Sequence, residues 1–113
     1  MSAITTHVLD TSRGRPAQGV RVVLERVEEG SPSVLARGLT DSDGRLRDLL
    51  PDGEPLEPGV FRLTFDTGRY FAGQGVQSFY PEVAVVFQVR DAGQHHHVPL
   101  LLSPFGYSTY RGS

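Results

Sequence analysis

Hydrophobic and polar residues alternate along most of this chain. In the segment 59–66, "GVFRLTFD", Phe61, Leu63 and Phe65 share one face and polar residues occupy the other, as in a half-buried β-strand. Short strands of this kind, separated by turn residues, predict an all-β sandwich of two sheets. The same alternation is found in 19–27, 33–41, 81–89 and 95–102, and clusters of turn-forming residues lie at 13–19, 28–33, 41–44, 51–59 and 90–93.

One segment, 67–75 with the sequence "TGRYFAGQG", does not alternate. We expect Thr67 to cap a short helix over 68–74 and Gly75 to end it, because threonine is a preferred N-cap and glycine a preferred terminator. The chain has no internal repeat and no linker of biased composition. We therefore predict a single domain over residues 1–113.

Composition excludes several kinds of chemistry. The 113 residues include no cysteine and no lysine, so disulfides, thiolate nucleophiles, cysteine-ligated metals and lysine Schiff bases are excluded. The net charge of −2 comes from interleaved acidic and basic residues, which gives no basic stripe for nucleic acid. No apolar run approaches the roughly 18 residues of a membrane span, and the N-terminus does not resemble a secretory signal. We expect neither a nucleic-acid nor a membrane partner, and a cytoplasmic location.

A histidine triplet, His95, His96 and His97, begins the last apolar strand. Side chains alternate in direction along a strand, so His96 is predicted to face the core while His95 and His97 face away from it. Two histidines spaced in this way on one strand can ligate zinc, which needs three or four ligands. Histidines with no ligand role account for the spacing equally well, and spacing leaves both interpretations open.

The first strand carries a second outward-facing histidine, His7. The terminal strands of a sandwich are often neighbours, and in that case His7 and His97 meet on one outer surface. That surface also carries Leu9, Pro99 and Leu101. An outward row of apolar residues indicates a subunit interface.

The segment 40–45, "TDSDGR", resembles the start of a calcium loop but has its glycine too early. In an EF-hand, glycine stands at the sixth position of the loop, whereas Gly44 is the fourth residue from Asp41. The pattern instead predicts a turn held by the side chain of Asp41 or Asp43. Such a turn would hold the guanidinium of Arg45 at its lip, although a solvated surface charge remains the alternative.

Four separated motifs together resemble one family, the transthyretin-related 5-hydroxyisourate hydrolases. The motifs are "THVLDTSRGRPAQGV", "TDSDGR", "FYPEVAVVF" and "HVPLLLSPFGYSTYRGS", and the terminal Tyr-Arg-Gly-Ser is the family signature. The resemblance implies a transthyretin-like sandwich of seven to eight strands with one short helix. It also implies a homotetramer, a dimer of dimers with the sites at the subunit interface.

The resemblance implies hydrolysis of 5-hydroxyisourate to 2-oxo-4-hydroxy-4-carboxy-5-ureidoimidazoline in urate breakdown, with no cofactor and no metal. The family usually has an aromatic residue between its two histidines, and His96 stands there in this chain. Because His96 should face the core, we expect this departure to affect packing rather than chemistry. The implied catalytic residues are His7, Arg45, His97 and Ser113, and the implied substrate-binding residues are His7, Arg45, Tyr110, Arg111 and Gly112.

These residue types suit hydrolysis of a cyclic amide. Imidazole titrates near neutral pH and can activate water, and a guanidinium can stabilise the anion that forms at the attacked carbonyl. We expect His7 and His97 to share the proton transfers, with the choice of base open, and Tyr110 and Ser113 to position substrate and water. Three other hypotheses are a zinc-dependent cyclic amidohydrolase using His7, His95 and His97, a non-catalytic carrier of small aromatic ligands, and a β-sandwich interaction module.

Overall fold

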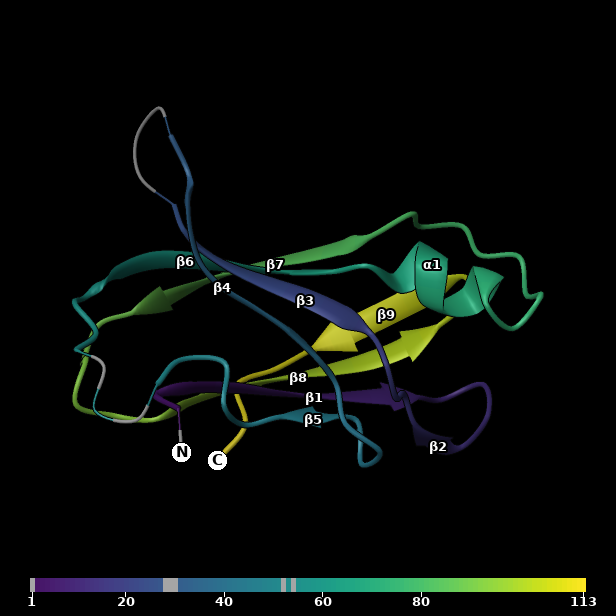
Figure 1. Ribbon diagram of the computed structural model, residues 1–113, viewed down its shortest axis with the longest axis horizontal. Coiled ribbons are helices and arrows are strands. Elements are labelled where there is room, and N and C mark those ends of the chain that lie inside the picture. Colours follow the sequence, from purple (N-terminus) through teal and green to yellow (C-terminus); the bar gives the residue numbers. More distant parts are fainter. Residues whose placement is uncertain (1, 28–30, 52, 54) are drawn as a thin grey trace.

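The computed structural model describes residues 2–27, 31–51, 53 and 55–113, and in it two sheets face each other with one short helix at an end (Figure 1). The predicted all-β sandwich is thereby confirmed. Parts of the turns predicted at 28–33 and 51–59 lie outside the described residues.

One sheet has the order β2-β1-β8-β9, and β5 also pairs with β1. Its strands are β1 (Ile4–Asp10), β2 (Arg15–Pro16), β5 (Arg45–Leu46), β8 (His96–Ser103) and β9 (Gly106–Thr109). The other has the order β4-β3-β6-β7, from β3 (Arg21–Arg26), β4 (Ser33–Leu39), β6 (Gly59–Phe65) and β7 (Val83–Val89).

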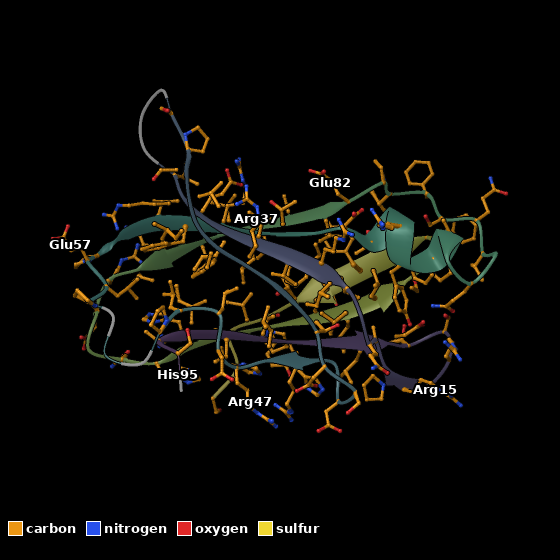
Figure 2. The ribbon with its side chains drawn as sticks, viewed as in Figure 1. Arg15, Arg37, Arg47, Glu57, Glu82 and His95 are labelled. Carbon is orange, nitrogen blue, oxygen red and sulfur yellow. The ribbon has the colours of Figure 1, made fainter. Side chains whose placement is uncertain are left out.

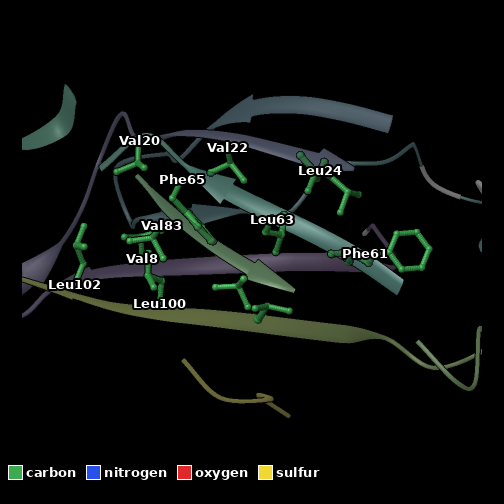
Figure 3. Packing of buried hydrophobic residues seen from close by; sticks show 14 of the residues in the cluster. Val8, Val20, Val22, Leu24, Phe61, Leu63, Phe65, Val83, Leu100 and Leu102 are labelled. Atoms are coloured by element: carbon green, nitrogen blue, oxygen red, sulfur yellow. The ribbon is translucent and has the colours of Figure 1, made fainter. Parts of the chain in front are cut away.

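The core lies between the two sheets and consists of the apolar sides of the alternating strands other than β4 (Figure 3). The alternation predicted for 33–41 gives β4 no buried face, because Val34, Leu35 and Leu39 of this edge strand are exposed. Phe61, Leu63 and Phe65 of β6 are fully buried, as their period of two predicted. They pack into one cluster with Val8 of β1 and Leu100 of β8 from the opposite sheet. Burial of one such side chain contributes about 1.5 to 3 kcal/mol, so the alternation fixes which face of each strand turns inward.

The first strand and the last long strand lie side by side in the sheet, as predicted. β1 and β8 run parallel, in a register that pairs Thr5 with His97 and His7 with Pro99. In the parallel arrangement, the outward side chains of both strands form neighbouring rows on the outer face. Leu9 and Leu101 on these rows are half-buried, whereas Pro99 is buried.

The helix differs from the prediction at both ends. α1 covers Thr67–Ala72, its N-cap is Asp66, and its C-cap is Gly73 rather than Gly75. The capping role assigned to Thr67 is wrong: its side chain is buried, and its Oγ1 has no hydrogen-bond partner among the described residues. Since the hydroxyl is turned into the protein, it cannot reach the free N–H groups of the first turn.

Two features of the last strands were not predicted. The strand β8 begins at His96, so His95 precedes it, and the chain then turns through 104–105 into β9. Most of β9 is exposed, so it carries no alternating apolar pattern that could reveal a strand. Within the described residues, no helix has the length and apolar character needed to cross a membrane.

Candidate functional site

A tight turn places Arg45 beside the first strand. The Asp41 carboxylate accepts the N–H groups of Asp43 at 2.8 Å and Arg45 at 3.0 Å, which confirms the predicted aspartate-held turn. Gly44 has φ +74°, and a Cβ there would lie 2.3 Å from the carbonyl oxygen of Val8. Only glycine fits so close to β1, and the turn therefore delivers Arg45 into β5 at a fixed position.

His7 lies directly opposite Arg45 in the pairing of β1 with β5. Its ring Nε2 lies 2.8 Å from the carbonyl oxygen of Asp43. A carbonyl oxygen can only accept, so Nε2 carries the hydrogen and donates it. In the neutral ring this leaves Nδ1 as the atom that can take up a proton.

His97 is held through the hydroxyl of Thr5, which faces it across the β1–β8 pair. Thr5 Oγ1 lies 2.8 Å from His97 Nδ1 and 2.9 Å from His95 Nε2, so one buried hydroxyl joins the two rings. The rings of His95 and His97 are nearly parallel, with centroids 6.3 Å apart. From strand spacing and rise, the Cα atoms of His7 and His97 are roughly 8 Å apart on the same outer face.

The C-terminal segment passes over His97. The backbone N–H of Gly112 donates to the carbonyl oxygen of His97 at 2.9 Å. A Cβ on Gly112 would lie 2.5 Å from Cδ2 of the His97 ring and 3.3 Å from Cγ of Pro99. The segment therefore needs glycine at this position, and its passage explains why Pro99 is buried on an outward-facing row.

These elements enclose a small hollow of about 270 Å³ on the outer face of the five-stranded sheet. Figure 2 shows His95 and Arg47 on this outer side, below β1 in the view. The hollow brings together predicted residues from three distant parts of the chain, Arg45, His97 and Ser113. His7 stands beside it, across the ladder from Arg45. The full lining is Thr5, Thr6, Arg45, Arg47, His95, His97 and Ser113.

Two predicted residues lie elsewhere. Tyr110 and Arg111 line a neighbouring groove of about 260 Å³ that His97 also borders, and neither lines the hollow. The guanidinium of Arg111 donates to the side-chain oxygen of Gln94 at 3.1 Å. Tyr110 is 58% exposed, and the groove that it lines also includes residues of β7.

The surroundings of the histidines favour their neutral forms. Burial lowers the pKa of His97 below its ordinary value, and the charge of Arg45 lowers it further. The pKa of His7 is lowered by the same two causes in the same order. Burial and the charge of Arg111 lower the pKa of His96. His7 and His97 are thus favoured in their neutral forms near neutral pH, and a neutral ring can accept a proton.

Stability is expected to fall as the pH drops below about 6.5. In the unfolded chain these histidines regain their ordinary pKa, so below 6.5 the unfolded state binds more protons than the folded one. Urea unfolding between pH 7.5 and 5 measures the effect.

The variant Arg45→Gln should raise the pKa of His97 in an NMR titration, because it removes a nearby positive charge. Arg90→Gln, at an exposed position, should leave this pKa unchanged. An unchanged pKa in the Arg45 variant would contradict this electrostatic account.

The zinc hypothesis required three histidines at one point. Among the residues that the structure describes, no group of three or more His, Asp or Glu side chains is placed to hold a metal ion. His95 and His97 share the Thr5 hydroxyl, while His7 is bonded to the turn at Asp43.

Sequence reasoning did not identify Thr5 or Arg47, and considered His95 only as a zinc ligand. Thr5 stands two residues before His7, so the outward row of β1 was a signal for it. Arg47 likewise stands two residues after Arg45. Neither signal distinguishes a site residue from an ordinary surface residue until the strands are paired.

The fold and the site together define a class: a transthyretin-like sandwich whose outer sheet face carries paired histidines, an arginine and the C-terminal segment. A sequence model described as the HIUase/Transthyretin family matches residues 4–112, and the chain belongs to this family.

Relatives and solved structures agree with this assignment. A 5-hydroxyisourate hydrolase of Mus musculus is 48% identical over 114 residues, covering 99% of this chain and 96% of the relative. The structure of Klebsiella pneumoniae 5-hydroxyisourate hydrolase is similar with a TM-score of 0.85 and 41% identity, over 97% of this chain and 98% of that one. Sea bream transthyretin in complex with thyroxine has a TM-score of 0.90 and 31% identity, over 98% and 95%.

Proposed function

We propose that this protein hydrolyses 5-hydroxyisourate to 2-oxo-4-hydroxy-4-carboxy-5-ureidoimidazoline, a step of urate breakdown. The observation that carries the proposal is the hollow in which Arg45, His97 and Ser113 meet, with His7 beside it. The relative from Mus musculus named above, 48% identical, and one from Pseudomonas aeruginosa, 44% identical over the full chain, bear the same activity in their names. The hollow suits a small planar molecule rich in carbonyl groups, which a fixed guanidinium can bind.

The reaction needs one base, one acid and stabilisation of an anion. Water adds to a ring carbonyl carbon, and a histidine takes its proton as the new C–O bond forms. The ring C–N bond then breaks, and the leaving nitrogen receives a proton. We assign the proton transfers to His7 and His97, whose lowered pKa keeps them neutral, and stabilisation of the carbonyl oxygen to Arg45. Ser113 positions substrate or water at the rim of the hollow.

Thr5 is a positioning residue in this scheme. Its hydroxyl has one hydrogen, so it can donate to only one of the two imidazole nitrogens that it contacts. When it donates to His95, Nδ1 of His97 donates to it in turn, and Nε2 of His97 is free to act as a base. After Nε2 has taken a proton from water, the ring is an imidazolium, and it can pass that proton from Nε2 to the leaving nitrogen. The Thr5 hydroxyl thus fixes the tautomer of His97 in which Nε2 is the base.

The variant Thr5→Val is expected to lower kcat by between about 10-fold and 100-fold while KM changes little. Valine keeps the volume of threonine but removes the hydroxyl that orients both rings. Steady-state kinetics measure the effect, with the thermal unfolding midpoint as a check on the fold. Thr5→Ser keeps the hydroxyl and should recover most of the rate, whereas a merely structural role would give serine no advantage.

The activity itself is tested by generating 5-hydroxyisourate from urate with urate oxidase and following its optical decay. We expect this protein to accelerate the decay above the spontaneous rate, with and without prior exhaustive chelation. Loss of activity on chelation would favour the zinc-dependent hydrolase. No acceleration, combined with binding of small aromatic compounds, would favour the carrier hypothesis.

We further propose a homotetramer, a dimer of dimers with the sites at the subunit interface. Among the described residues, the edge strands β7 and β9 are each paired on one side only. Large apolar side chains are exposed near them, including Phe79, Phe105 and Tyr107. In the proposed assembly, the exposed side chain of Tyr110 contributes to the hollow of a second copy. Light scattering in solution tests the assembly.

A cytoplasmic location stays a prediction, to be tested by cell fractionation.

A further inference from the structure

A second pocket, of about 630 Å³, lies at the other end of the molecule from His95. Figure 2 shows Arg15 at this end, beside β2, and His95 at the opposite end. The pocket is formed by the β1–β2 turn, β2, the start of β3, the turn before β5, and α1 with the residues after it. None of its lining residues lines the hollow that contains His97. The proposed hydrolysis therefore does not use it.

The pocket has a strong excess of positive charge. Four of the eleven arginines of the chain line it, while Asp66 is the one acidic residue in its lining, which leaves a net formal charge of +3. The chain as a whole carries −2. The four are Arg13, Arg15, Arg21 and Arg69.

Three of these guanidinium groups have no partner within the part of the chain that the structure describes. Arg15, Arg21 and Arg69 make no side-chain hydrogen bond or ion pair there, and all three are exposed at the pocket. Guanidinium groups that line the same pocket repel one another, because they carry like charges. A multiply charged anion bound between them would offset this repulsion.

The frame of the pocket is held by contacts that need no ligand. The phenol of Tyr70 donates to the Asp10 carboxylate at 2.8 Å and ties α1 to the end of β1. The hydroxyl of Ser12 donates to the other oxygen of Asp10 at 2.6 Å. Arg13 donates to the side-chain oxygen of Gln74 at 3.3 Å, which links the β1–β2 turn to the end of the helix segment. The arginines thus project from elements that are already fixed relative to one another.

We propose that this pocket binds a small compound carrying two or more phosphate groups. Guanidinium matches phosphate oxygens in a bidentate fork, and several phosphates are needed to balance the charge of the lining. The volume lies in the range of small-molecule sites. A nucleic acid would require a basic stripe, whereas these four arginines line one pocket of a chain whose net charge is −2. This inference is independent of the proposed hydrolase activity.

The test measures binding of inorganic pyrophosphate and of adenosine triphosphate by calorimetry, with sodium sulfate at equal ionic strength as the reference. Both phosphate compounds should bind more tightly than sulfate and should raise the thermal unfolding midpoint. Equal affinity for the two means that only phosphates are recognised, and tighter binding of the nucleotide means that its base is contacted too.

The double variant Arg15→Gln/Arg69→Gln should bind pyrophosphate at least roughly 10-fold more weakly, because it removes two charge-assisted contacts. Both side chains are exposed, so the fold and the hydrolysis rate should be unchanged. Arg90→Gln, an exposed arginine outside the pocket, should bind like the parent protein. Undiminished binding in the double variant, affinity no greater than for sulfate, or tighter binding of a short oligonucleotide would overturn the proposal.

Discussion

Replacing either Arg45 or His97 by alanine should lower kcat/KM for 5-hydroxyisourate by at least about 100-fold. The Arg45 guanidinium lines the hollow beside His97 and is the cation assigned to the developing oxyanion. A preformed charge of this kind stabilises the transition state more than the substrate, so its loss should appear mainly in kcat. His97 is assigned a proton transfer, which contributes an effect of similar size.

The alanine variants need a control for the fold. Both side chains lie on the outer face of the sheet, away from the core between the sheets, so the thermal unfolding midpoint should change little. Arg90→Ala removes an exposed arginine from a turn and should retain full activity. Turnover near the parent level in folded Arg45→Ala or His97→Ala would refute the assigned roles.

Deleting residues 110–113 should abolish hydrolysis while leaving the sandwich folded. The deletion removes Ser113 from the hollow and the N–H of Gly112 from the carbonyl oxygen of His97. None of the deleted residues belongs to the buried hydrophobic cluster, so the core is preserved. Decay of 5-hydroxyisourate should return to its spontaneous rate, and the unfolding midpoint should stay within a few degrees of the parent value, the shift expected for a loss of about 1 kcal/mol. Unfolding of the truncated chain would show that the segment is structural.

A point substitution in the same segment tests whether the position of the segment matters, because the other residues of the segment stay in the chain. In Gly112→Ala the new Cβ would meet the His97 ring at 2.5 Å, so the segment must move off the ring or the ring must turn. We expect a large loss of activity with an intact fold. Gly73→Ala, just after α1 and outside the hollow, is a matched control that should retain activity, because its new Cβ would come no closer than 3.5 Å to its neighbours.

Local sequence pattern is informative where it leaves a side chain only a few possible directions. The inward row of β6 and the inward face of His96 followed from alternation, because a strand permits only two side-chain directions. The turn at Asp41 followed from residue types whose side chains bond to nearby backbone. The cap assigned to Thr67 failed, because packing turned its hydroxyl inward, which no local pattern records.

Three features can be read directly from the sequence: the class of fold, the inward and outward faces of the strands, and the motifs that identify the family. These features depend on residues close together in the chain, whose periodicity and turn chemistry are readable directly. Only the folded chain brings Thr5 between His95 and His97, places Gly112 against the His97 ring, and leaves Tyr110 outside the lining of the hollow. The Thr5 contacts join residues 90 and 92 positions apart. They exist only because β1 and β8 pair in one register, and that register is fixed by burial of the whole core rather than by either strand.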